Sequence, residues 1–431
     1  MFQDPVPVDD ARAAMGELFD SLLRAGLLQL HPGDTIVSPF VLALVDDLYV
    51  LSDELSRGGE AVMGFGETTI ALCVAALPDR VLDHVLDLGC GSGTCALVLA
   101  HRAKKVIGTD INPRAISLSQ INAVINGIPN VEFRLGSLFE PLKGETFDLI
   151  VSQPPFVPQP ADAKGATFLY GGAHGDELAL EVCHGVGNHL TANGRAIFIV
   201  EWPIYGDFTP EKRIRRTLGD APMDVLLLQT PGTTVEEHAT YYSAGIHPRL
   251  DEAFERDVLE RRQHLESLGI RRLHMSFTIL QKAQESIPLT QSLAVEQLHK
   301  IRVSNDRVNK IFATRKLLEH RDALLASTLR MPPKTILAQE QDEPGADVES
   351  TLSAKFSPEA LRPRINITLA MLGLLTAIHE SPTVQDGLQQ YADAYETPLE
   401  EALEQLLRMV EEAVQHGLLE IATVESNENA T

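Results

Sequence analysis

Two stretches of the sequence combine residue types that could bind and position reacting groups. Residues 85–93 read as a buried strand that runs into three glycines, Gly89, Gly91 and Gly93, and then into a helix. Glycines let the backbone turn sharply and approach a ligand closely, and the helix start offers unpaired N–H groups. Asp110 follows at the end of the next predicted strand, placed to accept hydrogen bonds from both ribose hydroxyls. The pattern predicts a nucleoside-containing ligand; a bare turn and a helix cap are the alternatives.

The second stretch is Gln153-Pro154-Pro155-Phe156, which directly follows a predicted buried strand at 147–152. Open α/β sheets bind ligands at the carboxyl ends of their strands. Two consecutive prolines fix φ and remove two N–H donors, so the loop is stiff and its carbonyls point outward as acceptors. A target NH2 group needs such acceptors. A rigid strand exit without a ligand is the alternative interpretation.

The glycine loop and its context resemble class I S-adenosylmethionine-dependent methyltransferases, over roughly residues 81–281. In that family the acid at the end of the first strand and the glycine loop hold the methionyl part of the cofactor. The resemblance therefore implies this role for Asp87, Gly89, Gly91 and Gly93, and it implies that Asp110 binds the ribose. The loop after the third predicted strand flanks the adenine in the family, and Ser137 lies there. Relatives often have Asp at that position, so we expect backbone contact. The lack of the final glycine of the dinucleotide pattern disfavours nicotinamide.

The loop at 153–156 resembles the Asn-Pro-Pro-aromatic signature of the amino-methyltransferases, which include the release-factor glutamine methyltransferases. In these enzymes the Asn oxygen and the first Pro carbonyl accept hydrogen bonds from the target nitrogen, and the aromatic ring stacks on the planar group. The resemblance implies these roles for Gln153, Pro154 and Phe156. Gln in place of Asn is a departure, because one added methylene displaces the acceptor by about a bond length.

The sequence thus predicts a methyltransferase that acts on an amide or amine nitrogen of a protein, peptide or natural-product substrate. One alternative is an RNA base N-methyltransferase, which the basic segments 211–216 and 293–330 would favour. Those segments could equally be solvated helix faces that pair with the acidic C-terminal part, and we favour this interpretation. Nucleic acid is therefore the less favoured partner. A second alternative is a SAM-fold interaction module in which Gln153 marks lost or altered catalysis.

The elements that must position these residues alternate in type along the middle of the chain. Strands are predicted at 85–88, 106–109, 131–134, 147–152, 196–201, 225–229 and 274–280, and helices at 94–103, 114–126 and 177–190. Such alternation is typical of a parallel sheet with crossover helices. We therefore expect an α/β fold with a Rossmann-like seven-stranded methyltransferase sheet, a small N-terminal α+β domain and a mainly helical C-terminal module.

Composition suggests five segments. We predict an N-terminal α+β domain at 1–80, with a helix over 10–28 and a hairpin over 41–51, and a SAM-binding methyltransferase domain at 81–285. A basic helical extension at 286–336 and a linker at 337–356 follow. Residues 357–431 are expected to form an acidic helical module, for which a winged-helix-like fold and a generic three-helix cap both remain open.

The overall composition is that of a globular protein with an acidic surface. The net charge is −24, and residues 337–431 hold 18 acidic and 4 basic residues. No segment has the apolar length of a membrane span, and the N-terminus lacks a signal-peptide pattern, so we expect a cytoplasmic protein. The four cysteines form no C-x-x-C pair, which predicts reduced thiols and no metal site. An oligomer is compatible with the sequence.

Overall fold

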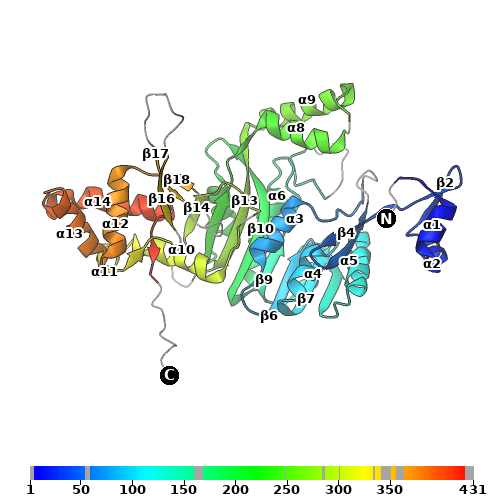
Figure 1. The fold of residues 1–431 in the computed structure, drawn as a ribbon, viewed down its shortest axis with the longest axis horizontal. Helices are drawn as coiled ribbons and strands as arrows, with labels where there is room; N and C mark the ends of the chain where they lie inside the picture. Colours follow the sequence, from blue (N-terminus) through cyan, green and yellow to red (C-terminus); the bar gives the residue numbers. More distant parts are fainter. Residues whose placement is uncertain are drawn as a thin grey trace. The chain divides into compact units, whose positions relative to one another are not determined.

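The computed structural model describes residues 4–53, 59–159, 168–247, 249–283, 287–299, 301–332, 335–340, 351–355 and 364–422. The chain divides into two compact units (Figure 1). Unit 1 comprises Met1–Val225 and Gly232–Pro288, and unit 2 comprises Leu226–Pro231 and Leu289–Thr431.

A mostly parallel sheet forms the centre of unit 1. Its strands are β6 (Leu82–Leu88), β7 (Ala103–Asp110), β8 (Val131–Leu135), β9 (Phe147–Ser152), β10 (Leu190–Tyr205) and β13 (Ile270–Lys282). They lie in the order β13-β10-β9-β6-β7-β8, with β13 antiparallel to β10 and the short β12 (Thr233–Thr234) paired with β13. The sixth of the seven predicted strands, β11 (Met223–Gln229), begins in unit 1 and ends in unit 2. The chain reverses its winding between β6 and β9, which makes the fold doubly wound and confirms the predicted α/β, Rossmann-like class.

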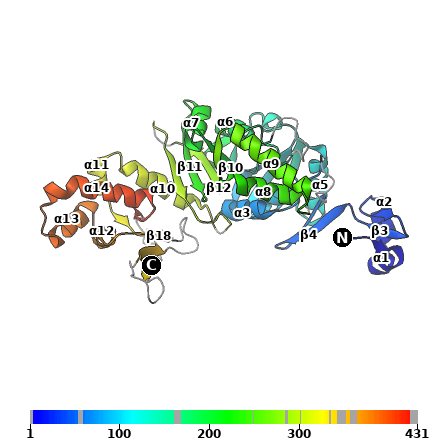
Figure 2. The same ribbon diagram turned by 90° about the horizontal axis from the view of Figure 1, so that it is seen from above.

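Helices cover both faces of this sheet. They are α3 (Glu67–Ala76), α4 (Thr94–Ala100), α5 (Pro113–Ile125), α6 (Glu177–His189) and α7 (Pro210–Leu218). Figure 2 shows α6 and α7 on one side of the strands and α3 on the other. A further pair, α8 (Val235–Ile246) and α9 (Glu252–Ser267), packs against β13. Two covered faces explain why the strands read as continuous apolar runs: Val85, Leu86 and Ile150 have no exposed surface.

Strand β10 is longer than the sequence predicts, because it continues past Glu201 through Pro203 to Tyr205. A proline inside a strand removes a ladder hydrogen bond, which is why the prediction ended earlier. The pairing with β9 stops at Phe198, and beyond that residue β10 pairs only with β13. Among the described residues, no strand therefore pairs with the β9 side of β10 at Pro203, and the missing N–H costs no ladder hydrogen bond on that side.

The N-terminal part of unit 1 contains a small sheet and two short helices. The helices α1 (Val8–Met15) and α2 (Leu18–Arg24) pack with β1 (Val6–Pro7), β2 (Gln29–His31) and β3 (Thr35–Val37). The prediction of one continuous helix over 10–28 is wrong, because Gly16 has φ 55° and ends α1. The predicted hairpin is confirmed as β4 (Phe40–Val45) and β5 (Leu48–Asp53).

Unit 2 is mainly helical. It contains β14 (Thr290–Ala294), α10 (Asn305–Leu317), α11 (Arg321–Ala326), α12 (Leu369–Glu380), α13 (Val384–Ala394) and α14 (Leu399–Gln415). Leu324 and Leu329 pack in one core with side chains of α12, α13 and α14, and β15 (Leu329–Arg330) pairs with β19 (Glu420–Ile421). A second antiparallel sheet joins β16 (Ile336–Glu340), β17 (Thr351–Lys355) and β18 (Arg364–Asn366).

The basic and acidic parts of unit 2 make ion pairs with each other. Arg315 lies 3.6 Å from Glu411, and Arg321 lies 2.8 Å from Glu404. These two contacts agree with the interpretation that the basic segment 293–330 pairs with the acidic C-terminal part, whereas Arg213 of the segment 211–216 is buried and pairs with Asp176 instead. The predicted linker at 337–356 includes β17 and most of β16, while its residues 341–350 and 356 lie outside the described ones. Among the described helices, none is long and apolar enough to cross a membrane.

Candidate active site

The glycine loop and the proline loop emerge from neighbouring strands at the point where the sheet reverses its winding. β6 pairs with β9 in parallel, with Leu88 opposite Ser152. The loop that follows Leu88 has positive φ at Gly89, Gly91 and Gly93, a conformation that glycine adopts without strain. An added Cβ at Gly93 would lie 2.9 Å from the Cβ of Ser119, so close helix packing also requires glycine there. The switch point of a doubly wound sheet is where such folds bind ligands.

Two carboxylates frame this loop. Asp87 is buried near the end of β6 and accepts a hydrogen bond from the backbone N–H of Ala96 (2.9 Å). Burial raises the pKa of Asp87 to about 7. Asp110 accepts hydrogen bonds from the N–H groups of Gly91 (2.9 Å) and Asn112 (2.8 Å), so it ties the glycine loop to the start of α5. Burial also raises the pKa of Asp110 above its usual value.

A cavity of about 300 Å³ lies over these groups. The sequence-predicted site residues that line it are Asp87, Gly89, Gly91, Asp110, Ser137, Gln153, Pro154 and Phe156. Gly93 stands behind the loop and does not line the cavity. The volume lies at the small end of the range for ligand pockets, and the lining combines apolar walls with a few polar groups. One cavity thus brings together the groups that the resemblance assigns to cofactor and acceptor.

The side chain of Gln153 is held by two hydroxyl groups at the start of α3. Its Nε2 donates to Thr68 Oγ1 (2.8 Å), and its Oε1 accepts from Thr69 Oγ1 (3.1 Å). These contacts fix the longer amide in one orientation. The sequence interpretation did not foresee this pairing, since 85 residues separate Gln153 from Thr68. The available signals were the hydroxyl residues at a predicted helix start and the resemblance of residues 65–69 to a segment that closes over the methionine end in related enzymes.

The glycine-rich segment 171–175 packs against the backbone at the end of the proline loop. Gly171 N donates to Val157 O (3.2 Å), and Val157 N donates to Leu169 O (2.9 Å). An added Cβ would lie 2.7 Å from Phe156 Cα at Gly171 and 2.5 Å from Phe156 O at Gly175. Only glycine permits this approach, and the backbone of Phe156 is thereby held in place.

A buried ion pair fixes the end of that segment. Arg213 Nε lies 2.7 Å from Asp176 Oδ2, and the same guanidinium donates to Pro203 O (2.8 Å). The ring of His174 packs at a tilt against that of Tyr205, with the centroids 4.8 Å apart, and His174 does not line the cavity. Trp202 is fully buried and donates to Thr278 Oγ1 (2.9 Å), so it serves packing.

Two thiols belong to the cavity wall. Cys90 and Cys95 line the cavity, and Cys95 lies 3.4 Å from the thiol of Cys73. Burial raises the pKa of Cys90, and the nearby carboxylates of Asp87 and Asp110 raise it further. The described cysteines are free thiols, and no cluster of potential metal ligands occurs within the described residues.

The strand order, the glycine loop after β6 and the proline loop after β9 have the arrangement that the resemblance to class I methyltransferases implies. Residues 67–199 match the model of the family described as the methyltransferase small domain. Over these residues the chain is similar to that family. The matched segment contains α3, both loops and the strands from β6 to β9, and it ends within β10.

Curated relatives carry consistent names. A putative protein N5-glutamine methyltransferase of Methanocaldococcus jannaschii is 36% identical over 128 residues, which cover 28% of this chain and 64% of the relative. The release factor glutamine methyltransferase of Aliivibrio fischeri is 45% identical over 91 residues, which cover 19% of this chain and 32% of the relative. The chain thus spans about a third to two thirds of these relatives' length. A ribosomal protein L11 methylase structure from Lactobacillus delbrueckii subsp. bulgaricus aligns with a TM-score of 0.30 at 18% identity, covering 52% of this chain and 81% of that one.

Proposed function

We propose that the chain is an S-adenosylmethionine-dependent methyltransferase that transfers a methyl group to a planar amide or amine nitrogen. The observation that carries the proposal is the shared cavity, in which the glycine loop after β6 and Gln153 after β9 line the same space. A protein side-chain amide is the favoured acceptor, since the relatives named above are glutamine methyltransferases.

The residues present fit the cofactor. An added Cβ at Gly89 would meet no described atom within 4 Å, which leaves the open, side-chain-free approach that a methionyl group requires. Asp87 is a buried carboxylate suited to the cofactor's ammonium group, and Asp110 keeps lone pairs for ribose hydroxyls beside its two backbone donors. Ser137 lines the cavity next to Leu138, where we expect the adenine. The cofactor supplies an electrophilic methyl group on a sulfonium.

Methyl transfer depends more on the position of the acceptor nitrogen than on the strength of an acid or base side chain. A nitrogen lone pair must be in line with the methyl–sulfur bond, so positioning supplies most of the acceleration. Gln153 Oε1 and the carbonyl of Pro154 would accept hydrogen bonds from the target nitrogen, and Phe156 would stack on the planar group. The two threonine contacts hold Gln153 for this task.

The RNA alternative loses one of its supports in the structure. Arg213, in the basic run 211–216, is 8% exposed and pairs with Asp176 rather than facing solvent. Arg315 and Arg321 are engaged with acidic residues of unit 2. These contacts reduce the positive surface that phosphate binding requires.

The proposal is tested in two stages. Calorimetry should show S-adenosylmethionine or its demethylated product binding at micromolar level, and a hundredfold ligand excess should add about 2.7 kcal/mol to the free energy of unfolding. Methyl-labelled cofactor should then label a release factor or another protein in a fractionated lysate. Label in RNA would favour the RNA alternative, and binding without any transfer would favour an interaction module. Folded protein without cofactor binding contradicts the proposal.

Cofactor affinity should fall as the pH is lowered from 7 to 5.5. Asp87, with a pKa of about 7, becomes protonated over this range and loses its attraction for the ammonium group. An α-amino group titrates near about 7.7–8.0 and stays charged here, so the dissociation constant should rise roughly ten- to twentyfold. Calorimetry at several pH values measures the slope. Asp87→Asn should bind weakly with little pH dependence, and an unchanged slope in this variant would assign the effect to another group.

A further inference from the structure

One wall of the cavity comes from residues that precede the matched family segment. Residues 59–66, here called the cover segment, join the hairpin strand β5 to α3, and Ala61, Val62, Met63 and Gly64 line the cavity. The side chain of Val62 is 3% exposed. An added Cβ at Gly91 would lie 4.0 Å from Met63 O, an ordinary van der Waals distance, so Met63 neighbours the glycine loop.

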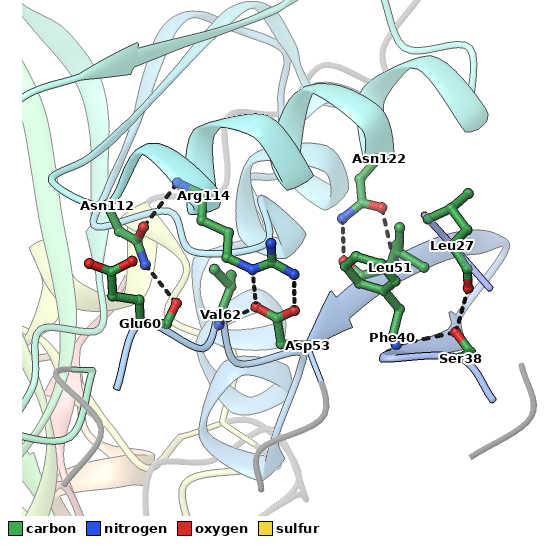
Figure 3. A network of polar contacts seen from close by, with 10 residues as sticks. All are labelled: Leu27, Ser38, Phe40, Leu51, Asp53, Glu60, Val62, Asn112, Arg114 and Asn122. Carbon is green, nitrogen blue, oxygen red and sulfur yellow. Dashed lines mark hydrogen bonds and ion pairs between the residues drawn. The ribbon is translucent and has the colours of Figure 1, made fainter. Parts of the chain in front are cut away.

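A buried carboxylate anchors the cover segment to α5. Asp53, at the end of β5, accepts a hydrogen bond from Val62 N (2.9 Å), while its own N–H donates to Val62 O (3.0 Å) (Figure 3). Arg114 donates from Nε to Asp53 Oδ2 (2.6 Å) and from Nη2 to Oδ1. The Asp53 side chain has no exposed surface, and that of Arg114 is 33% exposed. A bidentate pair of this kind is strong and directional, so it fixes where the cover segment can lie.

A second anchor connects the cover segment to the glycine loop. Asn112 Nδ2 donates to Glu60 O (3.1 Å), and Asn112 Oδ1 caps α5 by accepting from Arg114 N (2.9 Å) (Figure 3). The backbone N–H of Asn112 donates to Asp110, which also accepts from Gly91. A continuous chain of hydrogen bonds therefore runs from the cover segment through Asn112 and Asp110 to the glycine loop.

We propose that the cover segment is a wall of the cofactor site and that Asp53, Arg114 and Asn112 are positioning residues that hold it over the bound cofactor. The inference rests on the proposed function and extends it to the cover segment and Asp53, which lie outside the matched family segment. A wall that covers a ligand raises the barrier to its departure. Loosening an anchor should therefore speed dissociation, while the fraction of chains able to bind stays the same.

The test measures the dissociation rate of labelled S-adenosylmethionine from the full chain after a chase with unlabelled cofactor. Asp53→Asn removes the buried charge and leaves the half-exposed Arg114 in water contact, and the dissociation rate constant should rise about tenfold. Asn112→Ser keeps a good helix cap but loses the donor to Glu60, and it should also raise the rate, by several-fold. The matched control is Asp83→Asn, which breaks the exposed Asp83–Lys104 pair (2.7 Å) and should leave the rate unchanged.

The outcomes separate the possibilities. A variant that only weakens folding would lower the number of binding sites per chain and keep the wild-type rate for those that bind. Rates within twofold of wild type in both Asp53→Asn and Asn112→Ser, with wild type binding normally, would overturn this inference and leave the proposed function intact. A folded wild-type chain that binds no cofactor would overturn both.

Discussion

Replacing Gln153 with alanine is expected to lower methyl-transfer turnover by roughly ten- to a thousandfold, because one or two orienting hydrogen bonds to the acceptor are lost. The dissociation constant for the cofactor should stay nearly unchanged, since Gln153 leaves β9 while the glycine loop follows β6. Turnover is measured with labelled cofactor at saturation, and affinity by calorimetry. A wild-type rate would make Gln153 a bystander and remove the main support for an amino-methyltransferase.

Gln153→Asn restores the family residue and sharpens the test. The shorter side chain cannot reach both Thr68 and Thr69 as Gln153 does, so we expect it to be less active than wild type despite matching the family. Thr68→Val removes one hydroxyl with little change in shape and should also lower turnover. Thr69→Ser keeps its hydroxyl and is the matched control. Higher activity of Gln153→Asn would show that the added methylene is a handicap that the two threonines do not compensate.

Asp110→Ala should weaken cofactor binding by roughly 1.5–3 kcal/mol, or about ten- to 150-fold, because it removes hydrogen bonds made by a charged acceptor. The variant also frees the N–H groups of Gly91 and Asn112, so the glycine loop loses its tie to α5. Calorimetry measures the affinity, and thermal unfolding of the ligand-free protein measures the cost of the lost tie.

Two further variants separate these effects. Asp110→Asn keeps an acceptor for one backbone donor and should fall between wild type and Asp110→Ala. Asp83→Ala removes an exposed carboxylate of the same domain and should bind as wild type does. An Asp110→Ala affinity within twofold of wild type would show that Asp110 serves only the loop and helix start.

The local sequence pattern was sufficient to predict the strands of the central sheet, but it did not predict the ends of several helices and strands. The run at 147–152 is buried on both faces and matches β9 residue for residue, because a continuous apolar strand has a strong sequence signal. The last part of β10 was not predicted because it contains Pro203, which lacks an N–H donor. The pairing of the neighbouring strands is needed to see that this missing donor costs little. The N-terminal periodicity indicated one helix, yet Gly16 in the left-handed region divides it.

In the candidate site, too, some features could be predicted from local sequence pattern and others depend on packing between distant residues. Asp87, Asp110 and Gln153 lie at the carboxyl ends of parallel strands, so their meeting in one cavity could be predicted from the parallel sheet. The two hydrogen bonds of Thr68 and Thr69 to Gln153 could not be predicted, because they depend on how α3 packs against α4 and β10. Residues 65–69 resemble the segment that closes over the methionine end of the cofactor in related enzymes, but residues 59–64 carry no motif. The place of the cover segment is set by hydrogen bonds between residues far apart in the chain, such as Asp53 and Arg114.

The thiols of Cys90 and Cys95 line the cavity, so a methyl donor bound there would lie near two groups of the protein that can be methylated. A sulfonium methyl donor beside a thiolate would be attacked by it, and the protein would modify itself irreversibly. The thiolate is the nucleophile, and burial together with the carboxylates of Asp87 and Asp110 holds the pKa of Cys90 well above its usual range. Cys95 is likewise kept protonated beside Cys73. If the proposed cofactor binds here, the acidic surroundings that suit its cationic group also protect the wall from it and leave the methyl group for the proposed nitrogen acceptor.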